Sequence, residues 1–243
     1  MLDNYFVLSY LCLIIALQSS AGVGILVLGT PFLLLIGYNI VDIFFLLLPL
    51  SILTSFLNMI IMKLTIKKIE PVSLKELFKF FIACVPSIIV GLFILKFFQE
   101  YINFKFLVST IIICSILLVM LKDKISYKIN FFRISILSIV GVIHGLTNSG
   151  GTLMSLILST DKQKIHARYS ITIFYLLLAL IQYGLINFIF KGSIFFSDYV
   201  NLITVLFIGI LLGNLFINFL SENKYKLLIN FLAILSSIFL LLF

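Results

Sequence analysis

The sequence has very little charge. Only 11% of its 243 residues are Asp, Glu, Lys or Arg, whereas 63% are hydrophobic, and the mean hydropathy is +1.29. A chain of this composition cannot present a water-compatible surface, which excludes a soluble globular protein. The length leaves room for about six to eight membrane spans of about 20 residues each and for no sizeable soluble domain. The composition therefore predicts an all-α polytopic membrane protein.

Carboxylates are absent from the interior of every apolar segment. The nine Asp and Glu residues lie in connectors or at segment ends, at Asp3, Asp42, Glu70, Glu76, Glu100, Asp123, Asp161, Asp198 and Glu222. Carriers driven by protons usually keep an intramembrane carboxylate as a relay, because a charge there is costly and persists only for a role. The distribution argues against a proton-driven carrier of cations or sugars.

The sequence also lacks the usual enzyme and cofactor motifs. It contains no H-E-x-x-H or G-x-S-x-G pattern and no Cys and His set with the spacing of metal ligands. The three cysteines are odd in number and lie within apolar segments, as small packing residues do. We therefore expect no catalysis, no cofactor and no metal. The N-terminal stretch MLDNYFVLSY has no Lys or Arg, so it does not resemble a signal peptide and we expect it to be retained.

Eight apolar segments alternate with short connectors that carry most of the lysines. The segments lie at residues 5–37, 43–62, 78–98, 104–121, 134–159, 169–190, 199–220 and 225–243. In the connector at 63–79, Ser73 and Glu76 have the spacing of a capping box. This connector is therefore expected to start a helix rather than to form a substrate site.

The two halves of the chain have the same layout. The most polar break, at 122–133, predicts a cytoplasmic linker between a first repeat at 1–121 and a second at 134–243. Placing residue 148 on residue 22, an offset of 126, aligns NSGGTLMSLI with GVGILVLGTP and brings the later segments into register within a few residues. Such repeats are common in secondary transporters, whose sites lie where interrupted helices of the two halves meet. A chance alignment of two strings of membrane helices is the alternative.

The distribution of Lys and Arg indicates how the segments cross the membrane. If all eight cross it, the 17 basic residues divide almost evenly between the two faces. If segments 5–37 and 134–159 dip in and return, all but three of the 17 lie on one face, as the positive-inside rule predicts. As a single helix, 5–37 would also extend about 50 Å, against a hydrocarbon core of about 30 Å. We therefore expect two inverted repeats in the cell inner membrane, each a glycine-broken re-entrant hairpin plus three transmembrane helices, with both termini outside.

The expected hairpin tips, QSSAGVG and HGLTNSGG, are rich in Gly, Ser, Thr and Asn. Glycine tolerates unusual dihedral angles, and hydroxyl and amide groups can satisfy a broken backbone. The first N–H groups of each return arm have no intrahelical partner and lie at the positive end of the helix dipole, so two opposed tips predict an anion pocket. Close helix packing is the alternative role of these glycines. The candidate substrate-binding residues are Ser19, Ser20, Gly22, Gly24, Pro31, His144, Thr147, Asn148, Ser149, Gly150, Gly151, Thr152 and Gln182.

His144 is the one ionisable side chain expected near the bilayer midplane. It either takes a proton near neutral pH and helps to bind the anion, or braces the hairpin as a neutral, hydrogen-bonded ring. His166 and Arg168 are expected at the cytoplasmic mouth as positive-inside residues rather than as ligands. Gln182 either lines the path of the substrate or bonds to a neighbouring helix.

The broken segments resemble the hairpins of the TauE/SafE sulfite exporter family, in which G-x-G-G-G is followed by a short apolar run and P-x-L, once per half. Gly22, Gly24, Pro31, Leu33, Gly150 and Gly151 match this pattern, and Ile25, Leu26, Asn148, Thr152 and Ile157 depart from it. The stretch HARYSITIFYLLLALIQY is similar to the one that opens the family's next helix. The resemblance covers nearly the whole chain. It implies a permease for small sulfur-containing or organic anions, such as sulfite, thiosulfate or sulfonates.

The expected partners are a small anionic substrate and anionic lipid at the cytoplasmic face, where the basic connectors lie. Nucleic acid is not expected despite the formal net charge of +8, and a homo-oligomer is left open. The alternatives are a transporter of another class, such as a drug/metabolite-type carrier, a membrane subunit that does not transport, and an enzyme. Transport of labelled anion in liposomes, or turnover in detergent, separates them.

Overall fold

The computed structural model describes residues 5–22, 24–66, 71–120, 133–159, 164–190 and 199–216, and single positions at 221, 227, 231, 234, 238, 241 and 242. These ranges are helical apart from short connections, and they contain no strand. Three described helices are long and apolar enough to cross a membrane: α3 (Ile40–Thr65), α4 (Leu74–Phe98) and most of α9 (Lys164–Phe190). The fold is that of a polytopic membrane protein.

Two of the expected apolar segments are broken into pairs of shorter helices. Segment 5–37 forms α1 (Tyr5–Ala21) and α2 (Ile25–Leu35), and segment 134–159 forms α7 (Arg133–Thr147) and α8 (Gly151–Ser159). Both breaks lie at the glycine-rich stretches where the sequence predicts them. No arm exceeds 17 residues, or about 26 Å at about 1.5 Å per residue, so none is long enough by itself to span the hydrocarbon core.

The two breaks have the same local geometry. Gly22 and Asn148 both have a left-handed backbone, with φ of 82° and 65°, which Gly and Asn tolerate better than other residues. Each donates its N–H to the carbonyl four residues earlier, Gly22 to Gln18 at 2.7 Å and Asn148 to His144 at 2.9 Å. Gly22 and Asn148 are also the two residues that the offset of 126 places on each other.

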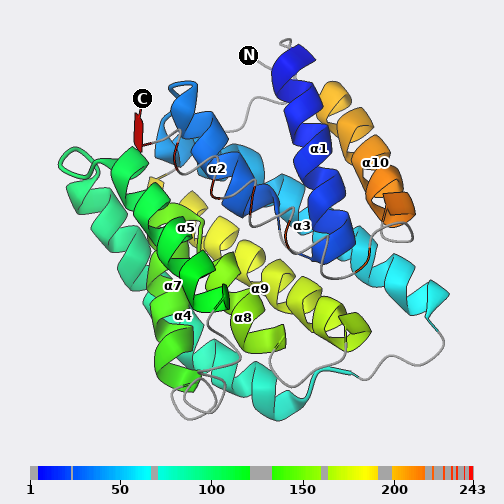
Figure 1. The fold of residues 1–243 in the computed structure, drawn as a ribbon. Helices are drawn as coiled ribbons and strands as arrows, with labels where there is room; N and C mark the ends of the chain where they lie inside the picture. Colours follow the sequence, from blue (N-terminus) through cyan, green and yellow to red (C-terminus); the bar gives the residue numbers. More distant parts are fainter. Residues whose placement is uncertain are drawn as a thin grey trace.

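Helices from opposite ends of the chain pack side by side. α1 lies along α10 (Tyr199–Phe216) on one side of the molecule, α4 lies along α7 on the other, and α3 packs against α9 between them (Figure 1). α5 (Phe104–Met120) contacts α2 and α8. In the predicted repeats α7 is the counterpart of α1 and α10 is the counterpart of α4. The α4–α7 pair is then the counterpart of the α1–α10 pair.

Both outer pairs approach through a glycine. A Cβ atom on Gly91 of α4 would lie 2.3 Å from the carbonyl oxygen of Val142 in α7, and one on Gly213 of α10 would lie 2.3 Å from that of Ala16 in α1. Any side chain would force these backbones apart, so the packing role that the sequence allowed for glycine applies at both contacts. Ala16 and Val142 are again 126 positions apart.

The helix bounds differ from the expected segments mainly at the starts. α3 begins at Ile40 and α9 at Lys164, whereas the apolar segments were expected to begin at 43 and 169. The expected capping at α4 is present, because Ser73 Oγ accepts the N–H of Glu76 at 3.2 Å. Most of the linker 122–133 and of the last segment, 225–243, lies outside the described residues.

Candidate functional site

Gln18 fixes the first tip, which comprises residues 18–22 and Gly24. Its Nε2 donates to both oxygens of Ser51, each at 3.2 Å, and to Ser55 Oγ at 3.1 Å, and its Oε1 accepts the N–H of Ile25 at 3.1 Å. Ile25 is the first residue of α2, so its N–H has no partner within that helix. A buried side chain of the protein therefore satisfies the first free amide of this return arm. The sequence interpretation, which left these amides for an anion, missed this contact.

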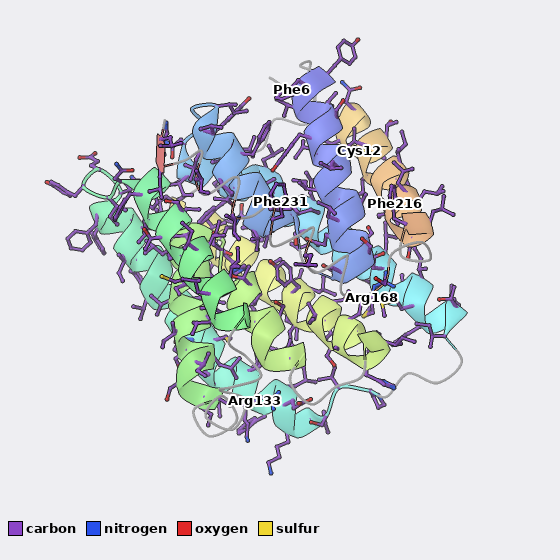
Figure 2. The ribbon with its side chains drawn as sticks, in the orientation of Figure 1. Phe6, Cys12, Arg133, Arg168, Phe216 and Phe231 are labelled. Atoms are coloured by element: carbon purple, nitrogen blue, oxygen red, sulfur yellow. The ribbon has the colours of Figure 1, made fainter. Side chains whose placement is uncertain are left out.

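Arg168 brings a positive charge to the first tip. Its guanidinium donates to the carbonyl of Ser19 and, at 3.4 Å, to Asn214 Oδ1 on α10. Asn214 Nδ2 in turn donates to Asn58 Oδ1 on α3 at 3.3 Å. Figure 2 shows Arg168 beside the end of α1. The sequence interpretation placed Arg168 at the cytoplasmic mouth as a positive-inside residue. In the structure α9 begins at Lys164, so Arg168 lies about one turn inside this helix.

The second tip, His144–Gly151, carries buried polar atoms that no described residue satisfies. His144 and Asn148 are fully buried, and neither the two ring nitrogens of His144 nor the side-chain amide of Asn148 has a hydrogen-bond partner in the described part of the chain. An unsatisfied buried donor or acceptor costs about 1–3 kcal/mol. Native structures rarely leave several such atoms together unless a ligand, ion or water meets them.

Tyr175 and Gln182 of α9 line the second tip. The Tyr175 hydroxyl is buried and has no partner among the described residues, and neither does Gln182 Oε1. The Tyr175 ring lies against Gly151, where an added Cβ atom would be 1.8 Å from the hydroxyl oxygen, and its centroid is 6.4 Å from that of the His144 ring. Gln182 Nε2 donates to the carbonyl of His144 at 3.0 Å. Tyr175 was not predicted, because an aromatic residue in an apolar helix gives no distinguishing signal.

One face of α9 contacts both tips. A Cβ atom on Gly22 would lie 3.1 Å from Thr172 Oγ1 and 3.2 Å from the carbonyl of Arg168, and Gly151 lies against Tyr175. Thr172 and Tyr175 are three residues apart and therefore neighbours on the helix surface. The two breaks are thus brought within about one turn of each other along α9.

The remaining predicted residues mostly support the tips themselves. Four hydroxyls bond within their own hairpin: Ser20 to Ala16, Thr147 to Ile143, Ser149 to Thr147 and Thr152 to Ser149. The buried Ser19 Oγ has no hydrogen-bond partner among the described residues. Gly24 and Gly150 let the two arms of each hairpin approach, since a Cβ atom would meet Gln18 N at 2.9 Å and the Val140 carbonyl at 2.6 Å. Pro31 lies inside α2, about 9 Å along the helix from Ile25, and is not brought to the tip.

The described residues contain no group of three His, Cys, Asp or Glu that could hold a metal ion. What converges on α9 is one guanidinium, several neutral donors and acceptors, and the starts of two helices. This set can hold a small polar solute, and its only formal charge is positive.

The chain matches a known protein family over nearly its whole length. A family model described as Sulfite exporter TauE/SafE matches residues 7–240. No curated protein matches the chain significantly, and neither does any solved structure.

Proposed function

Since the chain belongs to the Sulfite exporter TauE/SafE family along residues 7–240, it is a membrane transporter of sulfite-type anions, and we propose that these pass through a site where the two hairpin tips meet on α9. The observation that carries this proposal is the set of buried, unpartnered polar atoms of His144, Asn148, Tyr175 and Gln182. Solute oxygens can accept from the Tyr175 hydroxyl and the Asn148 amide, which removes the cost of leaving these groups unsatisfied.

Two positive contributions favour an anion over a neutral solute. The start of α8 at Gly151 presents free N–H groups and the positive end of the helix dipole. Arg168, half-buried on the same face of α9, adds a full charge. The substrates proposed are small anions of the sulfite, thiosulfate and sulfonate class, held by hydrogen bonds rather than by a metal.

We further propose that the protein consists of two inverted repeats, each a re-entrant hairpin followed by three spans. Two observations support this arrangement. Gly22 and Asn148 both have a left-handed backbone, and the α1–α10 pair becomes the α7–α4 pair when the two proposed repeats are interchanged. Movement of the hairpins against the other helices would open the site alternately to each side.

The proposed topology puts Met1 and Asp42 on the same side of the membrane. Epitope or cysteine tags at these positions should therefore react equally with a membrane-impermeant reagent in intact cells. Tags that report from opposite sides would make segment 5–37 an ordinary crossing and contradict the hairpin.

Transport by the purified protein tests the proposed function. We expect liposomes containing it to take up radiolabelled sulfite with saturable kinetics, and unlabelled thiosulfate or a small sulfonate to compete. Protein-free liposomes give the background. If none of the three anions enters faster than this background in either direction of the gradient, the proposed substrate class is wrong.

A further inference from the structure

A cleft of about 220 Å³ opens between the start of α4 and helices α7, α8 and α9. Its polar lining consists of Ser73, Lys75, Glu76, Lys79 and Arg133. Sites for drug-sized ligands are usually about 300–1,000 Å³, so this cleft suits a small ion. The sequence interpretation took this connector as a helix start only.

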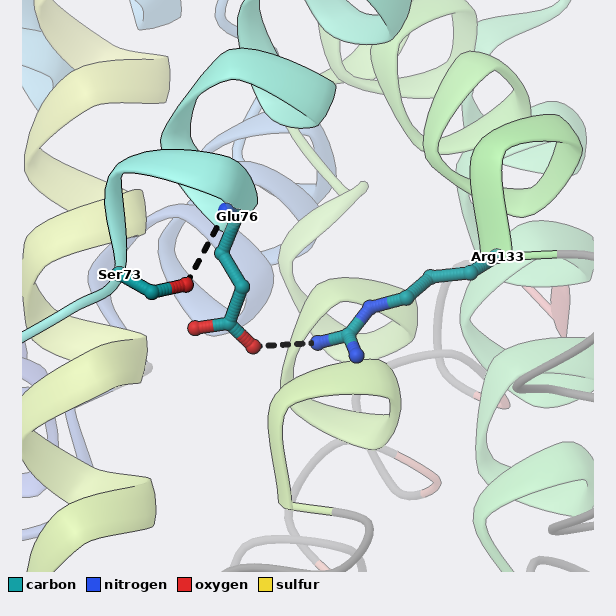
Figure 3. Close-up of polar contacts among 3 residues, drawn as sticks. All are labelled: Ser73, Glu76 and Arg133. Atoms are coloured by element: carbon teal, nitrogen blue, oxygen red, sulfur yellow. Dashed lines mark hydrogen bonds and ion pairs between the residues drawn. The ribbon is translucent and has the colours of Figure 1, made fainter.

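The charge of the cleft is positive overall. Glu76 pairs with Arg133, with Nη2 and Oε1 3.1 Å apart (Figure 3), and this pair neutralises itself. Lys75 and Lys79 also face the cleft, and neither forms an ion pair with a described residue. Among the described residues, these two lysine charges have no carboxylate partner and lie beside low-dielectric walls, an arrangement that concentrates anions.

The floor of the cleft is next to the second tip. Phe80 and Phe174 close it with ring centroids 5.0 Å apart, and both side chains are buried. Phe174 directly precedes Tyr175, and Met154, which also lines the cleft, lies one turn after Gly151 on α8. The same two helices therefore form the floor of the cleft on one side and the wall of the tip on the other.

We propose that this cleft is a second anion-binding site, which collects a small oxoanion at the lysine-rich face and passes it to the second tip when the Phe80–Phe174 contact opens. The proposal rests on the proposed function for the identity of the anion. In this proposal Lys75 and Lys79 recruit the substrate. Phe80 and Phe174 form the barrier between this recruitment site and the second tip. Binding in the cleft should be weaker and more sensitive to salt than binding at the tip, because the lysines are exposed to screening ions.

Calorimetric titration of the purified protein in neutral detergent with sulfite separates the two sites. We expect two binding events, of which the weaker loses affinity by about fivefold between low and physiological salt, where the Debye length falls to about 8 Å. The double variant Lys75→Gln, Lys79→Gln should lose the salt-sensitive event and keep the other. The double variant Lys75→Arg, Lys79→Arg should keep both, and Lys96→Gln with Lys105→Gln, which removes the same charge elsewhere, serves as the matched control.

Each result of the titration has one meaning. If the wild type binds sulfite once and the Lys75, Lys79 variant binds it equally, the cleft is not an anion site, although the transport function stands. If no sulfite binds at all, the proposed function fails first. Competition with short-chain phosphatidylglycerol tests whether the cleft binds a lipid headgroup instead of a free anion. If this lipid displaces sulfite from the cleft at far lower concentration, the lysines bind a lipid headgroup and the proposal is overturned.

Discussion

Replacing Gly151 with alanine is expected to reduce sulfite uptake by about 10- to 100-fold in a protein that still folds. The added Cβ atom would lie 1.8 Å from the Tyr175 hydroxyl oxygen, so the ring must leave its position at the tip. Overpacking of a rigid interior costs about 1–3 kcal/mol. When substrate binding loses this free energy, sulfite affinity falls by about 10- to 100-fold. The measurement is the initial rate of radiolabelled sulfite uptake into liposomes, with melting temperature recorded in parallel.

The matched control for this substitution is Gly184→Ala in α9, where the added Cβ would have no described residue outside its own helix turn within 4 Å. Alanine favours a helix over glycine by about 1 kcal/mol, so this variant should transport like the wild type and be no less stable. Uptake by Gly151→Ala at the wild-type rate would show that the contact between Tyr175 and the tip has no part in transport.

Replacing Arg168 with glutamine should have an effect at least as large. Arg168 supplies a positive charge at the first tip. Its guanidinium donates hydrogen bonds to the Ser19 carbonyl and to Asn214, which link this tip to α10. A hydrogen bond made by a charged group contributes about 1.5–3 kcal/mol, and the loss of that free energy from binding predicts a fall in sulfite affinity of about 10- to 100-fold. The measurement is the concentration dependence of uptake, in which the half-saturating sulfite concentration should rise.

Two further variants separate charge from geometry at Arg168. Lys96→Gln removes the same charge from an exposed position on α4 and should leave uptake unchanged. Arg168→Lys keeps the charge but cannot reproduce the fork of donors, so it should recover part of the affinity. If Arg168→Gln behaves like Lys96→Gln, Arg168 belongs with the ordinary basic residues of the membrane face, as the sequence alone suggested.

The positions of the helix breaks were predictable because they depend on local chemistry. Gly22 and Asn148 adopt backbone conformations that few other residues tolerate, and the clustering of small polar residues around them interrupts an otherwise apolar pattern. The offset of 126 between the halves rests on the same interruptions, and the duplication that it indicates stays a prediction. The start of α9 was less predictable, because Lys164, His166 and Arg168 are polar and the continuous apolar pattern begins only after them.

The partners of each tip were not predictable, because they lie far away in the sequence. Nothing in a single chain indicates that Gln18 reaches Ser51 and Ser55 on α3, or that Tyr175 faces Gly151. Two tips of similar composition were therefore expected to act alike. In the structure they differ: the Gln18 side chain occupies the start of the return arm at the first tip, whereas His144, at the equivalent position, leaves its ring nitrogens unpartnered among the described residues.

The most direct test of the anion site is to locate selenite, the heavier analogue of sulfite, by anomalous scattering from crystals of the protein grown with it. The hairpin account predicts a selenium peak within hydrogen-bonding distance of the Tyr175 hydroxyl and the Asn148 side chain, at the start of α8. A selenium peak found only outside the two tips, with none beside Tyr175, would contradict it.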